Sequence, residues 1–184
     1  MPAHRRPTRD DLAAAADRTL PTLAVPGLRV LFCGINPGLY SAWTGHHFAR
    51  PGNRFWPALH RSGFTPRQLA PAEQEELLAL GLGLTNVVER ASATAAELSS
   101  EELHAGGRRL VDDVVTYEPQ WLAVLGVTAY RTAFDRPRAT YGEQPERLGR
   151  TRVWVLPNPS GLNAHVTPPQ LAAAFAELRL AVEG

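Results

Sequence analysis

The chain contains no lysine, so arginine makes up all 19 of its basic residues. This usage is typical of a GC-rich genome. Its physical consequence is the same whatever the origin, because a guanidinium group binds phosphate through two parallel hydrogen bonds and stacks on flat groups better than an ammonium group does. With 18 acidic residues the formal net charge is only +1. This balance permits a local basic face but does not demonstrate one.

Cysteine occurs only once, as Cys33, which excludes an internal disulfide framework and a cysteine-based metal cluster. Long apolar segments are also missing, and no run has the length needed to cross a bilayer. The first seven residues are basic but lack the apolar stretch of a secretory signal. We therefore expect a cytoplasmic protein with no membrane partner.

Short apolar runs alternate with amphipathic segments along the chain. The pattern predicts strands at 28–33, 83–88, 121–125 and 153–156, and helices at 53–61, 71–80, 99–115, 128–134 and 168–182. In a chain of 184 residues, this alternation favours a single α/β domain. The expected architecture is a three-layer α/β/α sandwich with a mostly parallel central sheet.

Three segments are expected to lie outside this regular pattern. Residues 1–25 combine prolines with an arginine cluster and predict a poorly ordered basic arm, with one helix-compatible stretch at 10–18. Residues 34–52 predict a long loop rich in glycine, proline and aromatics, and 135–149 predict a polar connection. The folded domain is therefore assigned to residues 26–184.

A loop of turn-forming residues, Gly-Ile-Asn-Pro-Gly at 34–38, directly follows the first predicted strand. In open α/β sheets, ligands bind at the edge where the strands have their carboxyl ends. Glycine permits close backbone approach, proline fixes the turn, and Asn36 presents an amide that donates, accepts and does not titrate. The segment is neither a Walker phosphate loop nor a dinucleotide fingerprint. A plain turn and a ligand-binding loop both fit it.

Aromatic and histidine side chains crowd into the segment that follows: Tyr40, Trp43, His46, His47 and Phe48. Beside a strand end they can stack on a flat ligand, although one or two of them can cap the core instead. Adjacent histidines point apart in an extended chain, and no carboxylates or thiols cluster near them. We therefore expect neither a metal nor another cofactor.

A second loop, Asn-Pro-Ser-Gly-Leu-Asn at 158–163, follows the last predicted strand. Leu162 is apolar at what should be an exposed tip. It can tuck into the core, or it can act as a wedge, because proteins that open duplex nucleic acid push apolar side chains between stacked bases. Asn163 would then hydrogen-bond the base left without a partner. The two loops can face each other across a cleft.

Together these segments resemble one family. The segments are Gly-Ile-Asn-Pro-Gly at 34–38, Phe48, Asn-Arg-Phe-Trp at 53–56, Leu-His-Ala-Gly-Gly-Arg at 103–108 and Asn-Pro-Ser-Gly-Leu at 158–162. They look like the mismatch-specific uracil-DNA glycosylase and thymine-DNA glycosylase family, in particular its bacterial members, over roughly residues 28–178. The resemblance implies a monomeric α/β/α repair enzyme that acts on nucleoid DNA. It implies excision of uracil, and often of other damaged pyrimidines, opposite guanine in duplex DNA.

The sequence departs from the pattern of the bacterial members of this family in two respects. Thr-Asn-Val-Val-Glu-Arg at 85–90 and Gly-His-His at 45–47 are closer to the eukaryotic thymine-DNA glycosylase branch, whereas the loop at 158–162 is of the bacterial type. Asn-Ala-His at 163–165 stands where bacterial relatives carry an arginine. His165 is thus a weak candidate for filling the vacated base stack.

The resemblance also implies roles for individual residues. Asn36 would position the attacking water near C1′, since an amide cannot act as a general base at neutral pH. The expected base pocket consists of Ile35, Gly38, Ser41, Phe48 and Asn86, in which Phe48 stacks on the flipped base and Asn86 reads its edge. The expected wedge and opposite-base contacts are Asn158, Ser160, Gly161, Leu162 and Asn163. Positioning must then supply most of the rate, which predicts a slow enzyme.

Two other functions fit the residues. One is a binding module that recognises damaged DNA without turnover, and the other is a hydrolase of free nucleosides or nucleotides. The Asn36 loop argues against the first, because a binder has no need to place a water. Leu162 argues against the second, because a small-molecule hydrolase gains nothing from an exposed apolar wedge. The residues leave open the base preference, including thymine, hypoxanthine and xanthine.

Overall fold

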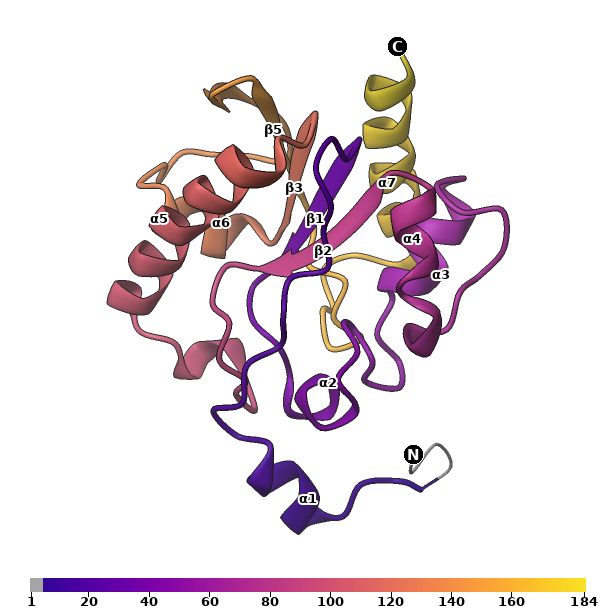
Figure 1. Cartoon of the computed structure of the whole chain (residues 1–184), viewed down its shortest axis with the longest axis vertical. Coiled ribbons are helices and arrows are strands. Elements are labelled where there is room, and N and C mark those ends of the chain that lie inside the picture. Colours follow the sequence, from indigo (N-terminus) through magenta and orange to yellow (C-terminus); the bar gives the residue numbers. More distant parts are fainter. Residues whose placement is uncertain (1–4) are drawn as a thin grey trace.

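The computed structural model describes residues 5–184, in which five strands form one sheet of order β2-β1-β3-β5-β4 (Figure 1). The strands are β1 (Val30–Gly34), β2 (Leu82–Asn86), β3 (Trp121–Leu125), β4 (Gly142–Leu148) and β5 (Thr151–Leu156). The pairs β1–β2, β1–β3 and β3–β5 are parallel, and only β4 runs antiparallel, along β5. The mostly parallel sheet predicted from the sequence is confirmed.

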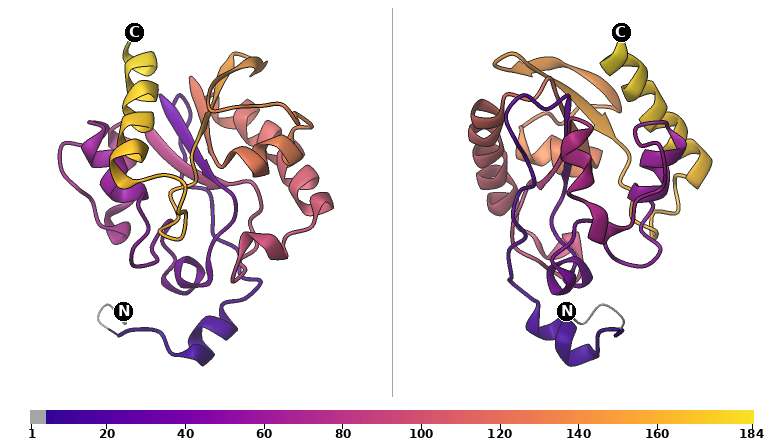
Figure 2. Two further views of the ribbon diagram at one scale, coloured as in Figure 1. Left: turned by 180° about the vertical axis from the view of Figure 1, so that it is seen from behind. Right: turned by 45° about the vertical axis from the view of Figure 1, so that its right-hand side comes forward.

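Helices cover both faces of this sheet. The helices are α1 (Arg9–Ala14), α2 (Leu39–Thr44), α3 (Phe55–Arg61), α4 (Glu76–Ala79), α5 (Ser100–Tyr117), α6 (Val127–Ala133) and α7 (Pro168–Glu183). Figures 1 and 2 show α5 and α6 on one face and α3, α4 and α7 on the other. Helix α5 begins as the sequence predicts, with a capping box between Ser99 and Glu102.

Alternate side chains of the buried strands enter two separate cores. Val30 and Phe32 of β1 pack with α3 and α7, whereas Leu31 and Cys33 pack with α5 and α6. Every residue of β1, β2 and β3 is buried, and β1 and β3 appear in the sequence as nearly continuous apolar runs, whereas β2 ends in the buried polar residues Thr85 and Asn86. The central strands could therefore be predicted reliably.

Residues 5–25 differ from the poorly ordered arm that the sequence predicts, and residues 1–4 of that arm lie outside the described residues. Ala15 and Leu20 are buried, and Leu23 and Leu84 exchange two backbone hydrogen bonds of 2.8 and 2.9 Å. Strand β2 is the outermost strand on its side of the sheet, so its open edge is available to pair with Leu23. This pairing attaches the segment to the domain.

Three other predicted segments are corrected. The polar connection at 135–149 contains β4, with the sequence Gly-Glu-Gln-Pro-Glu-Arg-Leu. This sequence has no apolar face, because β4 is an edge strand and its pairing with β5 shifts register between Glu143 and Arg147. The loop at 34–52 contains α2, which is too short to show a helical period. The single helix predicted at 71–80 is instead a 3₁₀ turn at Pro71–Glu73 followed by α4.

Two adjacent glycines let α5 approach the end of β2 and helix α6 closely. A Cβ atom on Gly106 would lie 2.1 Å from the carbonyl oxygen of Val87, and one on Gly107 would lie 2.3 Å from that of Ala133. Val87 follows β2 directly. The close approach of α5 therefore braces the end of that strand.

We expect Gly106→Ala to destabilise the protein by about 1–3 kcal/mol, the usual cost of overpacking, despite the better helix propensity of alanine. Urea unfolding measures this change. Arg108→Ala, at an exposed position of the same helix, is the control and should stay within about 0.5 kcal/mol of the wild type. A Gly106→Ala protein as stable as the wild type would contradict the close packing.

Candidate active site

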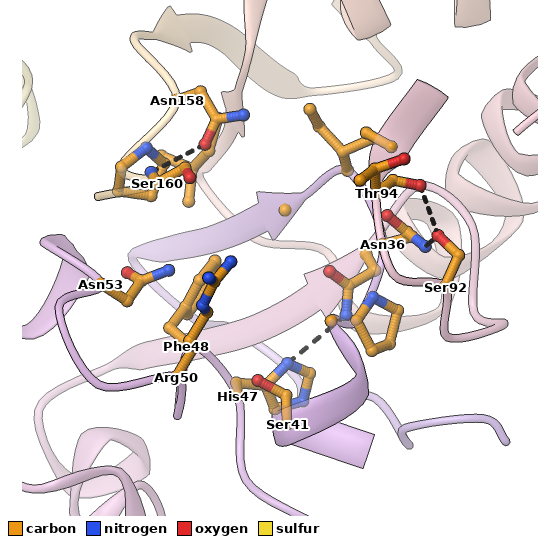
Figure 3. Close-up of a pocket in the computed structure, with 18 of the residues that line it drawn as sticks. Asn36, Ser41, His47, Phe48, Arg50, Asn53, Ser92, Thr94, Asn158 and Ser160 are labelled. Carbon is orange, nitrogen blue, oxygen red and sulfur yellow. Dashed lines mark hydrogen bonds between the residues drawn. The ribbon is translucent and has the colours of Figure 1, made fainter. Parts of the chain in front are cut away.

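A cavity of about 240 Å³ lies at the carboxyl edge of the sheet. The loops that follow β1, β2 and β5 all line it, and Figure 3 shows Asn158 and Ser160 across the cavity from Asn36 and Ser92. Nine of the predicted site residues contribute to its wall: Ile35, Asn36, Gly38, Ser41, Phe48, Asn86, Asn158, Ser160 and Leu162. Gly161 and Asn163 do not.

The amide of Asn36 is held in one orientation. One of its atoms lies 3.0 Å from the backbone oxygen of Arg90 and 2.8 Å from Oγ of Ser92. A carbonyl oxygen can only accept, so this atom is Nδ2. The Ser92 hydroxyl accepts from Asn36 and donates to the backbone oxygen of Thr94 at 2.7 Å. Both donors of Asn36 are thus used, and its Oδ1 faces the cavity (Figure 3).

The imidazole of His47 is held in a single tautomer. Its Nε2 lies 2.9 Å from the backbone oxygen of Pro21 and must carry the hydrogen, and its Nδ1 accepts from Nδ2 of Asn86 at 3.5 Å. The side chain is only 2% exposed, and this burial lowers the pKa of His47 to about 4. A neutral histidine therefore directs the amide nitrogen of Asn86 toward itself.

Phe48 forms an aromatic wall of the cavity. Its ring stacks on Phe55 with centroids 4.2 Å apart, and its backbone adopts a φ of 52°, which is uncommon outside glycine. The buried Ser41 supports this turn by accepting from the amide of Ala49 at 3.0 Å. A Cβ at Gly34 would lie 2.6 Å from Oδ1 of Asn86 and 3.2 Å from the Phe48 ring. Only glycine at position 34 leaves room for both side chains.

The loop at 158–163 presents Leu162 to solvent with its side chain 73% exposed. Its turn is built locally, because Asn158 Oδ1 accepts from the amide of Ser160 at 2.9 Å and Ser160 Oγ accepts from the amide of Leu162 at 3.2 Å. Arg54 attaches the loop to α3 by donating to the carbonyl oxygens of Asn163 (3.2 Å) and Gly161 (3.4 Å) within the loop and of Val166 (2.7 Å) just after it.

Asn163 and His165 lie outside the cavity wall. The side chain of Asn163 donates to the backbone oxygen of Asn158 at 3.1 Å and accepts from the amide of His165 at 3.1 Å, so it stabilises the loop rather than lining the cavity. His165 itself is exposed. Gly161 lines a smaller hollow beside the cavity, and a Cβ there would lie 2.4 Å from the backbone oxygen of Gly52.

The roles of three residues in this site are not predicted from the sequence. Ser92 fixes Asn36 but lies in a stretch with no motif of its own. Arg54 belongs to the Asn-Arg-Phe-Trp segment, which the sequence marks as a helix start and as part of the family resemblance but not as a contact to the Leu162 loop, although a charged residue there is a signal for such a contact. His47 was weighed as a metal ligand rather than as a partner for Asn86.

Among residues 5–184, no group of three His, Cys, Asp or Glu side chains is placed to hold a metal ion. No helix in that range is long and apolar enough to span a bilayer.

Stability should fall below pH 6.5 because of His47. The unfolded chain binds a proton near pH 6.5, whereas the folded protein resists it until about pH 4, so protons favour unfolding across this window. The ionisation of His47 should cost up to about 3 kcal/mol at its acidic end. Urea unfolding between pH 7 and pH 4 measures this loss, and NMR of the histidine ring follows the titration.

His47→Gln should show a flatter pH dependence than the wild type, whatever its stability at pH 7. His165→Gln, which removes an exposed imidazole, is the control and should follow the wild-type curve. Equal pH dependence in wild type and His47→Gln would contradict the role of burial at this residue.

Comparison with known proteins identifies the family of this chain. The family model described as "Uracil DNA glycosylase superfamily" matches residues 21–179. The fold is similar to the solution NMR structure of a "putative Uracil DNA glycosylase" from Methanosarcina acetivorans, with a TM-score of 0.58 over 89% of this chain and 98% of that chain. At 19% identity, this likeness supports the fold alone. Because the family match spans most of its length, the chain belongs to the uracil DNA glycosylase superfamily.

Proposed function

We propose that this protein is a DNA repair glycosylase that excises uracil opposite guanine from duplex DNA, as a single chain and without a covalent intermediate. The observation that carries the proposal is the orientation of Asn36, whose free Oδ1 faces the same cavity as Phe48 and Asn86. One chain supplies the loops on both sides of that cavity, which supports action as a monomer.

The pocket is suited to a flat, neutral base with a donor and an acceptor on one edge. Uracil presents N3–H and O4 there. With Nδ2 of Asn86 directed toward His47, its Oδ1 would accept from N3–H, and the second hydrogen on Nδ2 would be donated to O4. Cytosine reverses this pattern at both positions, so an amide held in this orientation disfavours it. The exposed ring face of Phe48 would stack on the base.

The chemistry would rely on placement rather than on a titrating base. No aspartate or glutamate lies among the described residues of the cavity wall, and His47 uses both ring nitrogens. The C1′–N1 bond would break with its electron pair leaving on uracil, which gives an oxocarbenium-like sugar. Water held by Oδ1 of Asn36 would add to C1′ and release a proton to solvent, and the uracil anion would take up a proton. Fixed geometry must then supply most of the rate.

Opening of the duplex would fall to the Leu162 loop. A base inside the stack is out of reach and must be flipped, which costs least at a mismatched pair. Leu162 is exposed, apolar and carried by a loop that Arg54 fastens at two carbonyl groups. We propose that Leu162 occupies the vacated space and that Gly161 and Asn163 contact the unpaired guanine. Mismatch preference would follow from the lower cost of opening G·U.

Asn36→Ala should reduce cleavage of a G·U duplex by about 100-fold or more, because a misplaced water forfeits the advantage of proximity. Single-turnover excision on denaturing gels measures the rate, and fluorescence anisotropy should show unchanged duplex binding. Testing the wild type on single-stranded DNA and on free deoxyuridine distinguishes this enzyme from a nucleoside hydrolase. Full activity in Asn36→Ala would remove this residue from the mechanism.

Leu162→Ala should slow excision from duplex DNA by roughly tenfold while sparing single-stranded substrate, because only the duplex needs opening. Leu180→Ala is a matched control, since Leu180 is a leucine on α7 that is 62% exposed. It should leave both rates unchanged. Equal losses on both substrates in Leu162→Ala would rule out the wedge.

A further inference from the structure

A second cavity, of about 540 Å³, adjoins the base pocket. The two share Phe48, Arg50 and Asn53 as a common wall. The second cavity runs from this wall along α3 as far as Arg61. Neither the Asn36 chemistry nor the Leu162 wedge uses this space.

The charged side chains lining the second cavity all have the same sign. They are Arg50, Arg54 and Arg61, with no aspartate or glutamate among the described lining residues. Arg54 is occupied by the carbonyl groups of the Leu162 loop and of Val166. The exposed side chains of Arg50 and Arg61 form no hydrogen bond or ion pair with other residues in the range 5–184. In a chain whose other arginines often pair with carboxylates, two guanidinium groups that line one cavity without a carboxylate partner favour an anionic ligand.

The wall between these arginines is suited to a backbone rather than to bases. It includes Pro51, Gly52 and Pro57, which offer no flat ring for stacking. The indole of Trp56 is buried and donates to the backbone oxygen of His47 at 3.2 Å. Helix α3, whose residues from Trp56 to Arg61 line one side of this cavity, is about 10 Å long, and one DNA strand carries a phosphate about every 3.4 Å along its axis. The cavity can therefore follow two or three successive phosphates.

We propose that the cavity between Arg50 and Arg61 is the track for the DNA backbone on one side of the flipped nucleotide. Arg50, at the junction with the base pocket, binds the phosphate next to that nucleotide. Arg61 binds a phosphate farther along the same strand. The assignment rests on the proposed glycosylase function, which requires the damaged strand to pass the mouth of the base pocket.

Arg50→Gln and Arg61→Gln test the track by salt dependence. The probe is a short duplex with a non-cleavable 2′-fluoro deoxyuridine opposite guanine. Each variant should reduce the slope of log K against log[salt] by about 1 and weaken binding about 3- to 10-fold at 100 mM salt. Arg147→Gln, on β4 opposite Arg152 at the start of β5 and so at the far edge of the sheet, is the control and should change neither quantity.

A neutral methylphosphonate linkage placed next to the deoxyuridine, on its 5′ or 3′ side, locates the contact. One of the two should weaken binding by the wild type but not by Arg50→Gln. Unchanged salt slopes in both arginine variants would overturn the proposal. The proposal would also be overturned if Arg50→Gln lowered the single-turnover rate at saturating enzyme but left the salt slope unchanged, because Arg50 would then act on the departing base.

The two proposals fail separately in these measurements. If the wild type binds the duplex and the arginine variants reduce the salt slope, but no uracil is released, the track stands and the proposed glycosylase function falls. If uracil is released normally and neither arginine alters the slope, the function stands and the track falls. Thermal unfolding of each variant confirms that loss of an exposed side chain has not altered the fold.

Discussion

The parallel pairing of β1 with β2 is the interaction on which the site depends. The two strands end in register, with Gly34 opposite Asn86. The pairing continues beyond the strands, because the amide of Val88 donates to the backbone oxygen of Ile35 at 2.9 Å and the amide of Ser92 donates to that of Pro37 at 3.2 Å. The two loops therefore leave the sheet side by side. This arrangement brings Asn36 to its partners and places Asn86 over Gly34.

A second connection joins this half of the site to the other. Arg54 lies at the start of α3, and its side chain reaches carbonyl groups more than 100 residues later in the chain. Its own amide donates to the backbone oxygen of Pro159 at 2.9 Å. The same short segment carries Arg50 and stacks Phe55 beneath Phe48. The cavity that contains Asn36, the Leu162 loop and the arginine-lined cavity are consequently built on one structural unit.

The chemistry that the site can perform follows from its lack of acidic groups. Among the described residues of the base pocket, Arg50 is the only one with a formal charge at neutral pH, and it stands at the boundary with the second cavity. Burial keeps His47 neutral, with a pKa of about 4. A pocket of amides, hydroxyls and aromatic rings can recognise a neutral base by shape and hydrogen bonding. Such a pocket offers no group for strong proton transfer, so a reaction in it would depend on orientation.

Much of this protein could be read from the sequence, for reasons specific to certain segments. Buried strands such as Trp121–Leu125 are continuous apolar runs, and the loops after them carry glycine and proline at recognisable positions. Strand β4 could not be predicted, because its polar residues become a strand only where β5 provides a partner. The packing of residues 15–23 was missed for the same reason, since the open edge of β2 is not visible in a local pattern.

The sequence by itself determined which chemical groups the site contains: the amide of Asn36, the ring of Phe48 and the apolar tip at Leu162. Only the tertiary structure decided how those groups are oriented. The free Oδ1 of Asn36 depends on Arg90 and Ser92, and the tautomer of His47 depends on Pro21. A hydrogen bond sets the direction of an amide or an imidazole. The partners in these bonds lie 26 to 56 residues away in the chain.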